Sequence, residues 1–372
     1  MVHALIVKTG ALKLSHMVSK KLSMVYMIPL LALFVRCEQK ITVESTVHPD
    51  GAIDRTVLFT GVDSSFLNDN MFGLRPGDGW EAEMERMTET PDANVKETPR
   101  PKYTVRFQRS FTSAGQANKT MDTPDDSLFR IRSTFHKRFR WFYSYIDYTD
   151  TYASINRFRH FPQSDFFAAE DFAFIERLPA SGRSISKADS VYLEFLTAKI
   201  YDHYMIAAVY EEHLTALEQA MKKNKLAAHW FDSLQHYRGV MFSWLSKDEP
   251  EDDAFEDAFF LQMLDSLNIG FPTESVAADY QQSYSSIKSR LDFMIAAAGG
   301  AKFTHIINMP WDVVDTNADS VSGSTLYWRP LPIKFMLGDY VMQGTARRLN
   351  YWAVILSAVV IVIAIAAFIK RK

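Results

Sequence analysis

The sequence predicts an α+β fold: an antiparallel β-sheet with an inserted block of about four long helices, plus one C-terminal transmembrane helix. Three observations predict this class. Apolar and polar residues alternate with period two before residue 155 and again after residue 300. Between residues 187 and 298, apolar residues recur every three or four positions, as on the buried face of a helix. The chain ends in a continuous apolar stretch.

That last stretch, Tyr351 to Ile369, predicts a helix that spans a membrane. It holds no charged residue and, apart from Tyr351 at its start, a single hydroxyl, that of Ser357. At about 1.5 Å per residue it is long enough to cross a hydrocarbon core of about 30 Å. Tyr351 and Trp352 stand where interfacial aromatic residues are expected, and Ile369 ends the span. A buried core helix is the alternative, but basic residues border both ends and favour a membrane anchor.

Residues 1–37 are interpreted as an N-terminal extension and an export signal. The apolar run Met24 to Val35 follows Lys20 and Lys21, which is the layout of a signal sequence. The run is too short to span a membrane comfortably. Cys37 follows it after one residue, Arg36, and is the candidate for lipid modification, as in a lipoprotein signal. An uncleaved signal-anchor and an ordinary cleavage remain open, because the residues before Cys37 are larger than either signal peptidase prefers.

Export of the N-terminus determines the expected orientation. Residues 38–350 follow the signal out of the cytoplasm, and the C-terminal helix stops the transfer. The basic tail, residues 370–372, then faces the cytoplasm, as the positive-inside rule prefers. We therefore expect a single-pass membrane protein whose main domain is periplasmic or extracellular.

Residues 38–186 are predicted to be rich in β-strands. A hairpin is expected first, because Asp50 and Gly51 supply a tight turn between two alternating runs. The Gly, Pro and acidic residues at 62–101 predict a loop. The strands are expected at 40–47, 52–60, 103–111, 128–135 and 137–152, with turns at 113–126 and 136.

The helical block is predicted at 187–298, after a short amphipathic helix at 165–178. Its helices are expected at 187–223, 226–245, 252–267 and 274–298. We favour an insertion of these helices into one sheet, because the strands at each end are too few to bury an aromatic face alone. The alternative is two separate domains joined near residues 162–179.

The chain is expected to close its sheet after the helices. Residues 299–330 hold two further alternating runs, predicted as strands at 303–308 and 321–328. Residues 331–350 are expected to be a juxtamembrane linker, apolar enough to lie along the membrane surface.

Histidines supply the candidate metal ligands. His229 and His236 lie seven residues apart on one predicted helix and share a face, while His203 and His213 lie on the preceding helix. Ligands from two facing helices can bind a metal. The spacing typical of zinc or di-iron helices does not occur in the sequence. We therefore expect structural or surface histidines, no bound metal and no cofactor.

The densest aromatic and basic stretch runs from Phe135 to Phe161. Such a surface can stack on sugars or bases, or lie against lipid head groups. The alternation Arg138, Phe139, Arg140, Trp141 instead favours a strand with its aromatic side chains inside and its arginines outside.

Composition and motifs weigh against several classes of protein. With 41 Lys and Arg against 44 Asp and Glu, the chain has no basic excess that would favour nucleic acid. Its single cysteine permits no internal disulfide. The sequence has no nucleophile elbow, P-loop, dinucleotide fingerprint or kinase motif, which disfavours an enzyme but leaves open one with unfamiliar residues. Asn118 begins an N-glycosylation sequon, meaningful only in a eukaryotic secretory pathway.

Three features together are similar to the LppM-type exported, membrane-anchored domains of bacteria. They are a signal ending at Cys37, a first hairpin carrying Asp50 and Gly51, and closing strands from Asn317 to Trp328 that lead to one helix with a basic tail. The resemblance implies a β-rich domain outside the membrane, in which the helical block looks like an insertion. The chain also resembles uncharacterised membrane proteins of the Bacteroidetes. Neither resemblance carries a function to particular residues.

The expected function is that of an exported, membrane-tethered interaction or structural protein of the cell envelope. Its expected partners are the lipid bilayer and a protein, glycan or lipid of the envelope, and nucleic acid is not expected. The alternative is an envelope hydrolase or metal-dependent enzyme that uses the helical block.

Overall fold

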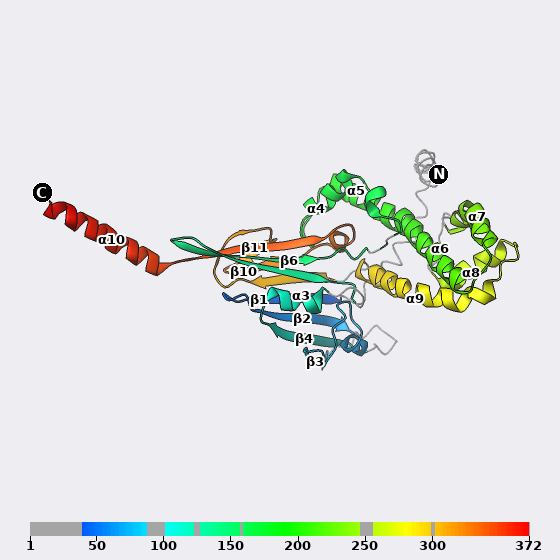
Figure 1. Cartoon of the computed structure of the whole chain (residues 1–372), viewed down its shortest axis with the longest axis horizontal. Helices are drawn as coiled ribbons and strands as arrows, with labels where there is room; N and C mark the ends of the chain where they lie inside the picture. The colour runs from blue at the N-terminus through cyan, green and yellow to red at the C-terminus, as the bar shows by residue number, and fades with distance from the viewer. Residues whose placement is uncertain are drawn as a thin grey trace, which may run out of the picture. The chain divides into compact units, whose positions relative to one another are not determined.

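The computed structural model describes residues 39–87, 101–122, 127–156, 158, 160–245, 256–298 and 302–371. The described chain divides into two compact units. The helical unit is formed by Asn156–Arg177 and Ser184–Gly299, and the β unit by residues before, between and after these segments. The helices therefore interrupt the β unit in sequence, as the colours of Figure 1 show. The predicted α+β class with an inserted helical block is confirmed.

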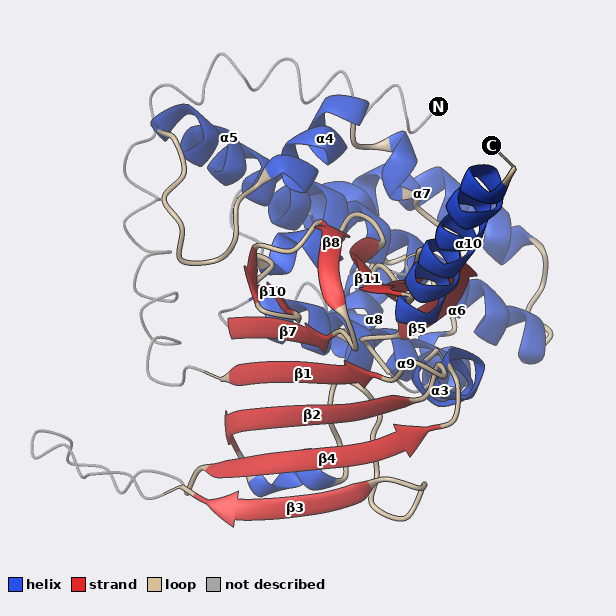
Figure 2. Ribbon diagram, turned by 90° about the vertical axis from the view of Figure 1, so that its left-hand side faces the viewer, coloured by secondary structure: helices blue, strands red, loops and turns tan. Residues whose placement is uncertain are grey.

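The strands of the β unit form two sheets. The first sheet has the order β3-β4-β2-β1-β7-β10-β9, and the second has the order β5-β6-β11-β8. Figure 2 shows β7, β1, β2, β4 and β3 side by side. The strands are β1 (Lys40–Val47), β2 (Ile53–Val62), β3 (Glu81–Arg86), β4 (Tyr103–Phe111), β5 (Ile131–Phe139), β6 (Tyr143–Tyr152), β7 (Lys302–Asn308), β8 (Asp312–Thr316), β9 (Ser320–Ser322), β10 (Thr325–Trp328) and β11 (Tyr340–Leu349).

Strand β1 joins the parts of the chain that precede and follow the helical unit. On one side it pairs with β2 through the expected hairpin, whose Gly51 has a φ of 97° that suits glycine. On its other side it pairs with β7 in parallel. This pair departs from the antiparallel sheet we predicted. Parallel neighbours need a long crossover connection, and the helical unit lies within that connection.

The two sheets of the β unit enclose a common core. Along β2 the side chains of Ile53, Val57 and Phe59 are fully buried and alternate with more exposed residues, which is the period-two pattern of a half-buried strand. Tyr152 of β6, in the second sheet, meets Phe303 of β7, in the first sheet, with ring centroids 5.5 Å apart. Side chains from both sheets thus share one interior.

Several expectations for the strands were wrong in detail. The loop expected at 62–101 contains β3, whose polar sequence gave no alternating signal. The turn expected at 113–126 contains the helix α3 (Ala114–Met121). The turn expected at residue 136 lies instead at 140–142, so β5 extends to Phe139. The single strand expected at 321–328 is divided into β9 and β10 at Gly323, whose φ is 59°.

The stretch 331–350 is not a juxtamembrane linker. It contains a 3₁₀ turn at Pro332–Phe335 and then β11, which pairs with β6 along its whole length. Strand β11 also pairs with β8 on its other side, so it lies inside the sheet. Its sequence hides this role, because Gly344, Arg347 and Arg348 interrupt the usual apolar alternation.

The helical unit follows the prediction closely. Its helices are α4 (Ala169–Arg177), α5 (Lys187–Ala198), α6 (Ile206–Lys223), α7 (His229–Leu245), α8 (Asp257–Ser266) and α9 (Thr273–Ala298). The stretch predicted as one helix at 187–223 is continuous, but a π-helical segment, Lys199–Met205, separates α5 from α6. Ser186 caps α5 by accepting a hydrogen bond from the Asp189 backbone N–H. Helix α6 is the most buried, and it packs on α9 and α7.

We expect Gly344→Ala to destabilise the β unit. A Cβ at Gly344, in β11, would overlap the side chain of Leu326, which lies in β10 of the other sheet. Crowding a packed core in this way costs about 1–3 kcal/mol of the free energy of unfolding. The matched control is Gly338→Ala, where an added methyl group meets open space. Chemical unfolding of the full chain in detergent measures both, and equal stabilities of the two variants would contradict the prediction.

Candidate functional site: a buried polar network and an exposed apolar helix

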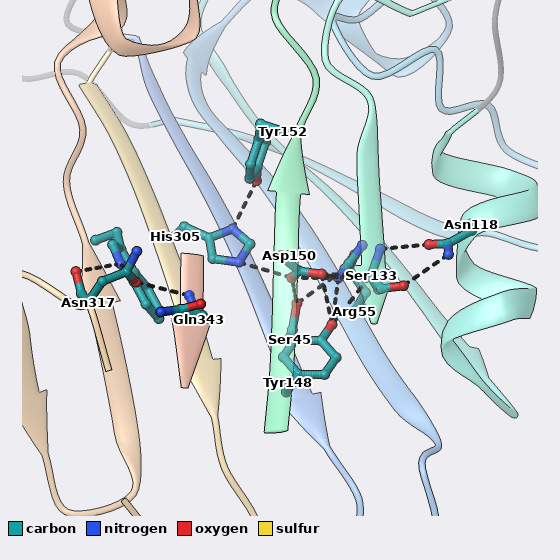
Figure 3. A network of polar contacts seen from close by, with 11 residues as sticks. Ser45, Arg55, Asn118, Ser133, Tyr148, Asp150, Tyr152, His305, Asn317 and Gln343 are labelled. Carbon is teal, nitrogen blue, oxygen red and sulfur yellow. Dashed lines mark hydrogen bonds and ion pairs between the residues drawn. The ribbon is translucent and has the colours of Figure 1, made fainter. Parts of the chain in front are cut away.

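A cluster of polar side chains lies in the core of the β unit, where its two sheets face each other (Figure 3). Strand pairing places its members. In the first sheet, Ser45 of β1 stands opposite Arg55 of β2. In the second sheet, Ser133 of β5 stands opposite Asp150 of β6. Each of these four residues occupies an inward position of its alternating strand and is almost completely buried.

The centre of the network is an ion pair between Arg55 and Asp150. The Arg55 Nη2 atom donates to both carboxylate oxygens of Asp150, at 2.8 Å and 2.7 Å, and neither side chain is exposed to solvent. Further hydroxyl groups donate to the same carboxylate, from Ser45 at 3.2 Å, Ser133 at 2.6 Å and Tyr148 at 2.9 Å. A buried carboxylate needs such a set of donors, because no water is present to solvate its charge.

His305 of β7 extends the network to a third strand of the first sheet. Its Nε2 atom lies 3.1 Å from Asp150 Oδ2, and its Nδ1 atom lies 2.8 Å from the hydroxyl oxygen of Tyr152. A neutral imidazole satisfies both contacts when Nε2 carries the proton and donates to the carboxylate, while Nδ1 accepts from the tyrosine. The ring is completely buried.

The electrostatics favour this assignment of charge. Burial raises the pKa of the Asp150 carboxyl, but the Arg55 guanidinium and the hydrogen bond from His305 outweigh it and hold that pKa well below its usual range. Burial lowers the pKa of His305, and the nearby Asp150 only partly offsets this effect. The network therefore contains one cation, one anion and a neutral histidine at neutral pH.

The arrangement suits a structural brace. A histidine next to an aspartate is one half of a catalytic triad. Here, however, Asp150 and His305 have no exposed surface, so a substrate could not reach either side chain without opening the core. What the network does is link the two sheets of the β unit through charge-assisted hydrogen bonds.

Sequence reasoning missed this network. The available signal was a charged residue at an inward position of an otherwise apolar alternation. Arg55 occupies such a position between Ile53 and Val57, and Asp150 occupies one between Tyr148 and Tyr152. Two such residues of opposite charge in different strands would have predicted a buried ion pair.

We expect Asp150→Asn to destabilise the β unit strongly. The substitution leaves the Arg55 charge buried without a counter-charge, which costs about 3–5 kcal/mol of the free energy of unfolding. The control is Asp147→Asn, which removes the more exposed ion pair with Arg138 and should cost less than about 1 kcal/mol. Urea unfolding of the full chain in detergent gives both values. The double variant Arg55→Met with Asp150→Leu should regain part of the lost free energy of unfolding. If Asp150→Asn alone lowers that free energy no more than Asp147→Asn does, the network is not a brace.

The structure does not bring the candidate metal ligands together. His229 and His236 both lie on α7, as predicted, and both are exposed. Each contacts the aromatic ring that follows it, Trp230 at a tilt or Tyr237 edge-on. His203 is also exposed, whereas His213 is buried. Within the described ranges, no three His, Cys, Asp or Glu side chains gather in a group that could hold a metal ion.

His213 belongs to the aromatic core of the helical unit. Its ring stacks between Phe260, with centroids 4.5 Å apart, and Tyr284, at 3.9 Å. Its Nδ1 atom lies 2.7 Å from the hydroxyl oxygen of Tyr280. Burial lowers the pKa of His213 to about 3, because a charged imidazolium would lose its hydration there.

The helical unit should consequently lose stability in acid. The folded-state pKa of His213 lies below the unfolded value of about 6.5. Between pH 6.5 and about 3 only the unfolded chain binds this proton, so stability is full above that window and falls as the pH drops, by up to about 1.4 kcal/mol per pH unit. His213→Phe should flatten this slope and the exposed-site control His203→Phe should not, as measured by urea unfolding followed by helical circular dichroism. Parallel slopes in all three proteins would contradict this assignment.

The sequence contains two candidate sites of covalent modification, Cys37 for lipidation and Asn118 for glycosylation. Cys37, the expected lipidation site, lies outside the described residues. The sequon residue Asn118 lies on α3, where its side chain donates to the backbone carbonyl of Ser133 at 2.9 Å and accepts from the backbone N–H of Ser133 at 2.6 Å. Because both polar atoms of the amide are engaged in the fold, Asn118 is a structural residue here.

The C-terminal helix α10 (Tyr351–Lys370) is the second candidate site. In the described part of the chain it is the one helix long and apolar enough to cross a membrane, with a mean hydropathy of 3.0. Its side chains are mostly exposed, and Ala353 is its buried residue. Isoleucine, valine and phenylalanine side chains thus point into solvent along its length, which marks a surface made for a non-aqueous environment.

Comparisons with known proteins give limited information about this chain. No protein-family model and no curated protein matches the sequence. Among solved structures, the chain is similar to the NMR structure of the folded domain of LppM from Mycobacterium tuberculosis. The similarity covers 84% of this chain and 92% of that one, at 7% sequence identity and a TM-score of 0.25. At that level it carries no argument about function.

Proposed function

We propose that the chain is a single-pass membrane protein whose β unit and helical unit lie outside the cytoplasm and serve as an interaction or structural module of the cell envelope. The observation that carries the proposal is the exposed apolar helix α10. Its 20 residues give a length of about 30 Å, which matches a hydrocarbon core. Leaving this much apolar surface in water would be costly, while a bilayer covers it completely.

The connection to α10 supports a role at the membrane surface. Asn350 is the one residue between the end of β11 and the start of α10. Strand β11 is held between β6 and β8, so the anchor continues directly from an inner strand of the second sheet. A tether this short keeps the β unit close to the lipid head groups and suits a partner that is itself a protein, glycan or lipid of the envelope.

The orientation rests on the two ends of the chain. The N-terminal layout of Lys20, Lys21 and the apolar run that follows favours export. The basic residues 370–372 favour a cytoplasmic C-terminus. Together they support a main domain on the periplasmic or extracellular side.

We expect α10 to be required for membrane attachment. A chain ending at Asn350 should appear in the soluble fraction, because it lacks the apolar span. A control chain ending at Ile369 keeps the span and should stay in membranes after alkaline carbonate extraction.

A labelling experiment tests the orientation. Asp78 is exposed in the β unit, so Asp78→Cys, introduced together with Cys37→Ser, supplies a single accessible thiol. A thiol reagent that does not cross membranes should label this variant in intact cells.

Three outcomes would overturn parts of this proposal. Carbonate-resistant attachment of the shorter chain, in a protein that carries Cys37→Ser and has lost its N-terminal signal, would refute the anchor. Labelling of Asp78→Cys only after cell lysis would reverse the orientation. Stoichiometric zinc or iron in the purified chain, lost on combining His229→Ala with His236→Ala, would favour the metal-enzyme alternative.

A further inference from the structure

The tip of the β5–β6 hairpin exposes large aromatic side chains. Phe139 is 60% exposed, Trp141 is 48% exposed and Phe142 is 45% exposed. The sequence alternation had predicted buried aromatics here, and that prediction was wrong. The hairpin extends past its expected turn, so these residues lie beyond the core. An exposed apolar cluster of this kind marks a surface that contacts something other than water.

The hairpin tip is attached to the first turns of α10. The Trp141 indole N–H donates to the hydroxyl of Ser357 at 2.9 Å. The ring of Trp352 stacks on Phe139, with centroids 6.1 Å apart, and meets Trp141 edge-on at 5.5 Å. The one serine in the apolar span is thus paired with a residue of the tip.

This contact determines how far the tip reaches along the helix. Ser357 follows Tyr351, the first residue of α10, by six positions. At about 1.5 Å per residue, Ser357 lies about 9 Å along the helix axis from that first residue. If α10 crosses a bilayer, the Trp141 side chain therefore lies below the start of the span.

The backbone carbonyl groups of the tip, at residues 140–142, all accept hydrogen bonds. The Arg140 N–H donates to the Tyr143 carbonyl at 2.7 Å, and the Asn350 N–H donates to the Phe142 carbonyl at 2.8 Å. The Asn350 side-chain amide donates to the carbonyls of Arg140 at 2.9 Å and Trp141 at 3.2 Å. Irregular backbone enters hydrocarbon only when its polar groups are paired in this way. Asn350 therefore serves the hairpin rather than capping α10.

Basic residues border the aromatic cluster. Arg140 at the tip is exposed, and Arg347 and Arg348 of β11 are exposed near the start of α10. Their long side chains can reach phosphate groups while the neighbouring rings stay in the apolar layer. Aromatic rings close to arginines occur at membrane interfaces. Here they contact the start of the apolar helix α10, which favours lipid as the occupant of this surface.

We propose that the tip of the β5–β6 hairpin, formed by Phe139, Trp141 and Phe142, inserts into the membrane interface beside α10. The occupant of this surface is the lipid bilayer, so the inference rests on the proposed membrane anchor and deepens it. The protein then has two points of contact with the membrane, a spanning helix and a shallow wedge. Two contacts fix the orientation of the β unit relative to the bilayer, which one flexible tether would not do.

Depth measurements in vesicles test the wedge. The full chain with Cys37→Ser receives a single cysteine labelled with an environment-sensitive fluorophore, at Phe142→Cys, Val362→Cys or Val341→Cys. Val362 lies in the middle of α10, and Val341 lies near the start of β11, about 26 Å along the strand from its membrane end. Each protein is reconstituted in phosphatidylcholine vesicles that carry nitroxide lipids labelled near the head group or deep in the acyl chain.

The three positions should give different results. At residue 142 we expect blue-shifted emission and several-fold stronger quenching by the shallow nitroxide than at residue 341. At residue 362 the deep nitroxide should quench best. Aqueous emission at 142 with deep quenching at 362 would overturn the wedge and leave the anchor intact. Aqueous emission at residues 142 and 362 alike would overturn both the wedge and the membrane anchor. A blue-shifted 142 that no nitroxide quenches would mean that protein covers the tip, and the lipid assignment would fail.

A second measurement needs no label at the tip. Brominated lipids should quench more tryptophan fluorescence in the unmodified chain than in Trp141→Phe, because the variant lacks one interfacial indole. The matched control is Trp328→Phe, which lies away from the tip. The Trp328 indole N–H donates to the backbone carbonyl of Asn317, whose side chain binds Val341 near the start of β11. Equal quenching of the unmodified chain and Trp141→Phe would overturn the insertion even if a labelled variant failed to fold.

Discussion

The buried ion pair between Arg55 and Asp150 is the contact on which the β unit depends. Each charge comes from a different sheet, and neither is reached by solvent. Such a pair adds little net stability compared with apolar residues of the same size, because desolvation of both groups offsets their attraction. It is costly to break, however, and its donors have a fixed geometry. It therefore favours one alignment of the two sheets over others that apolar packing alone would tolerate.

The same network lies at the two ends of the helical insertion. Tyr152 is the last residue of β6, after which the chain leaves for the helical unit. His305 lies in β7, the first strand after the chain returns. Their hydrogen bond joins these two segments inside the β unit, next to Asp150. Long insertions are tolerated when their ends are held in place, because the entropy of closing a loop grows slowly with its length.

The second sheet also connects this brace to the apolar helix α10. Strand β6 carries Asp150 in its second half, and along its length it pairs with β11. Strand β11 leads through Asn350 into α10, and Asn350 in turn binds the tip of the β5–β6 hairpin. Core, hairpin and anchor are thus parts of one hydrogen-bonded structure. If α10 spans a membrane, as proposed, this connection holds the β unit in a defined position rather than on a free tether.

The sequence by itself determined what depends on local periodicity and on hydrophobic length. The helices, most strands, the Gly51 hairpin and the long apolar C-terminal helix each leave a pattern in adjacent residues, and these elements were confirmed. The parallel pairing of β1 with β7, the inner position of β11 and the Arg55–Asp150 pair were decided only by the tertiary structure. Those features join residues that are far apart in the chain. Local periodicity in one sequence does not show which distant strands or charges pair with each other. A buried charge looks like a surface charge until its partner is placed.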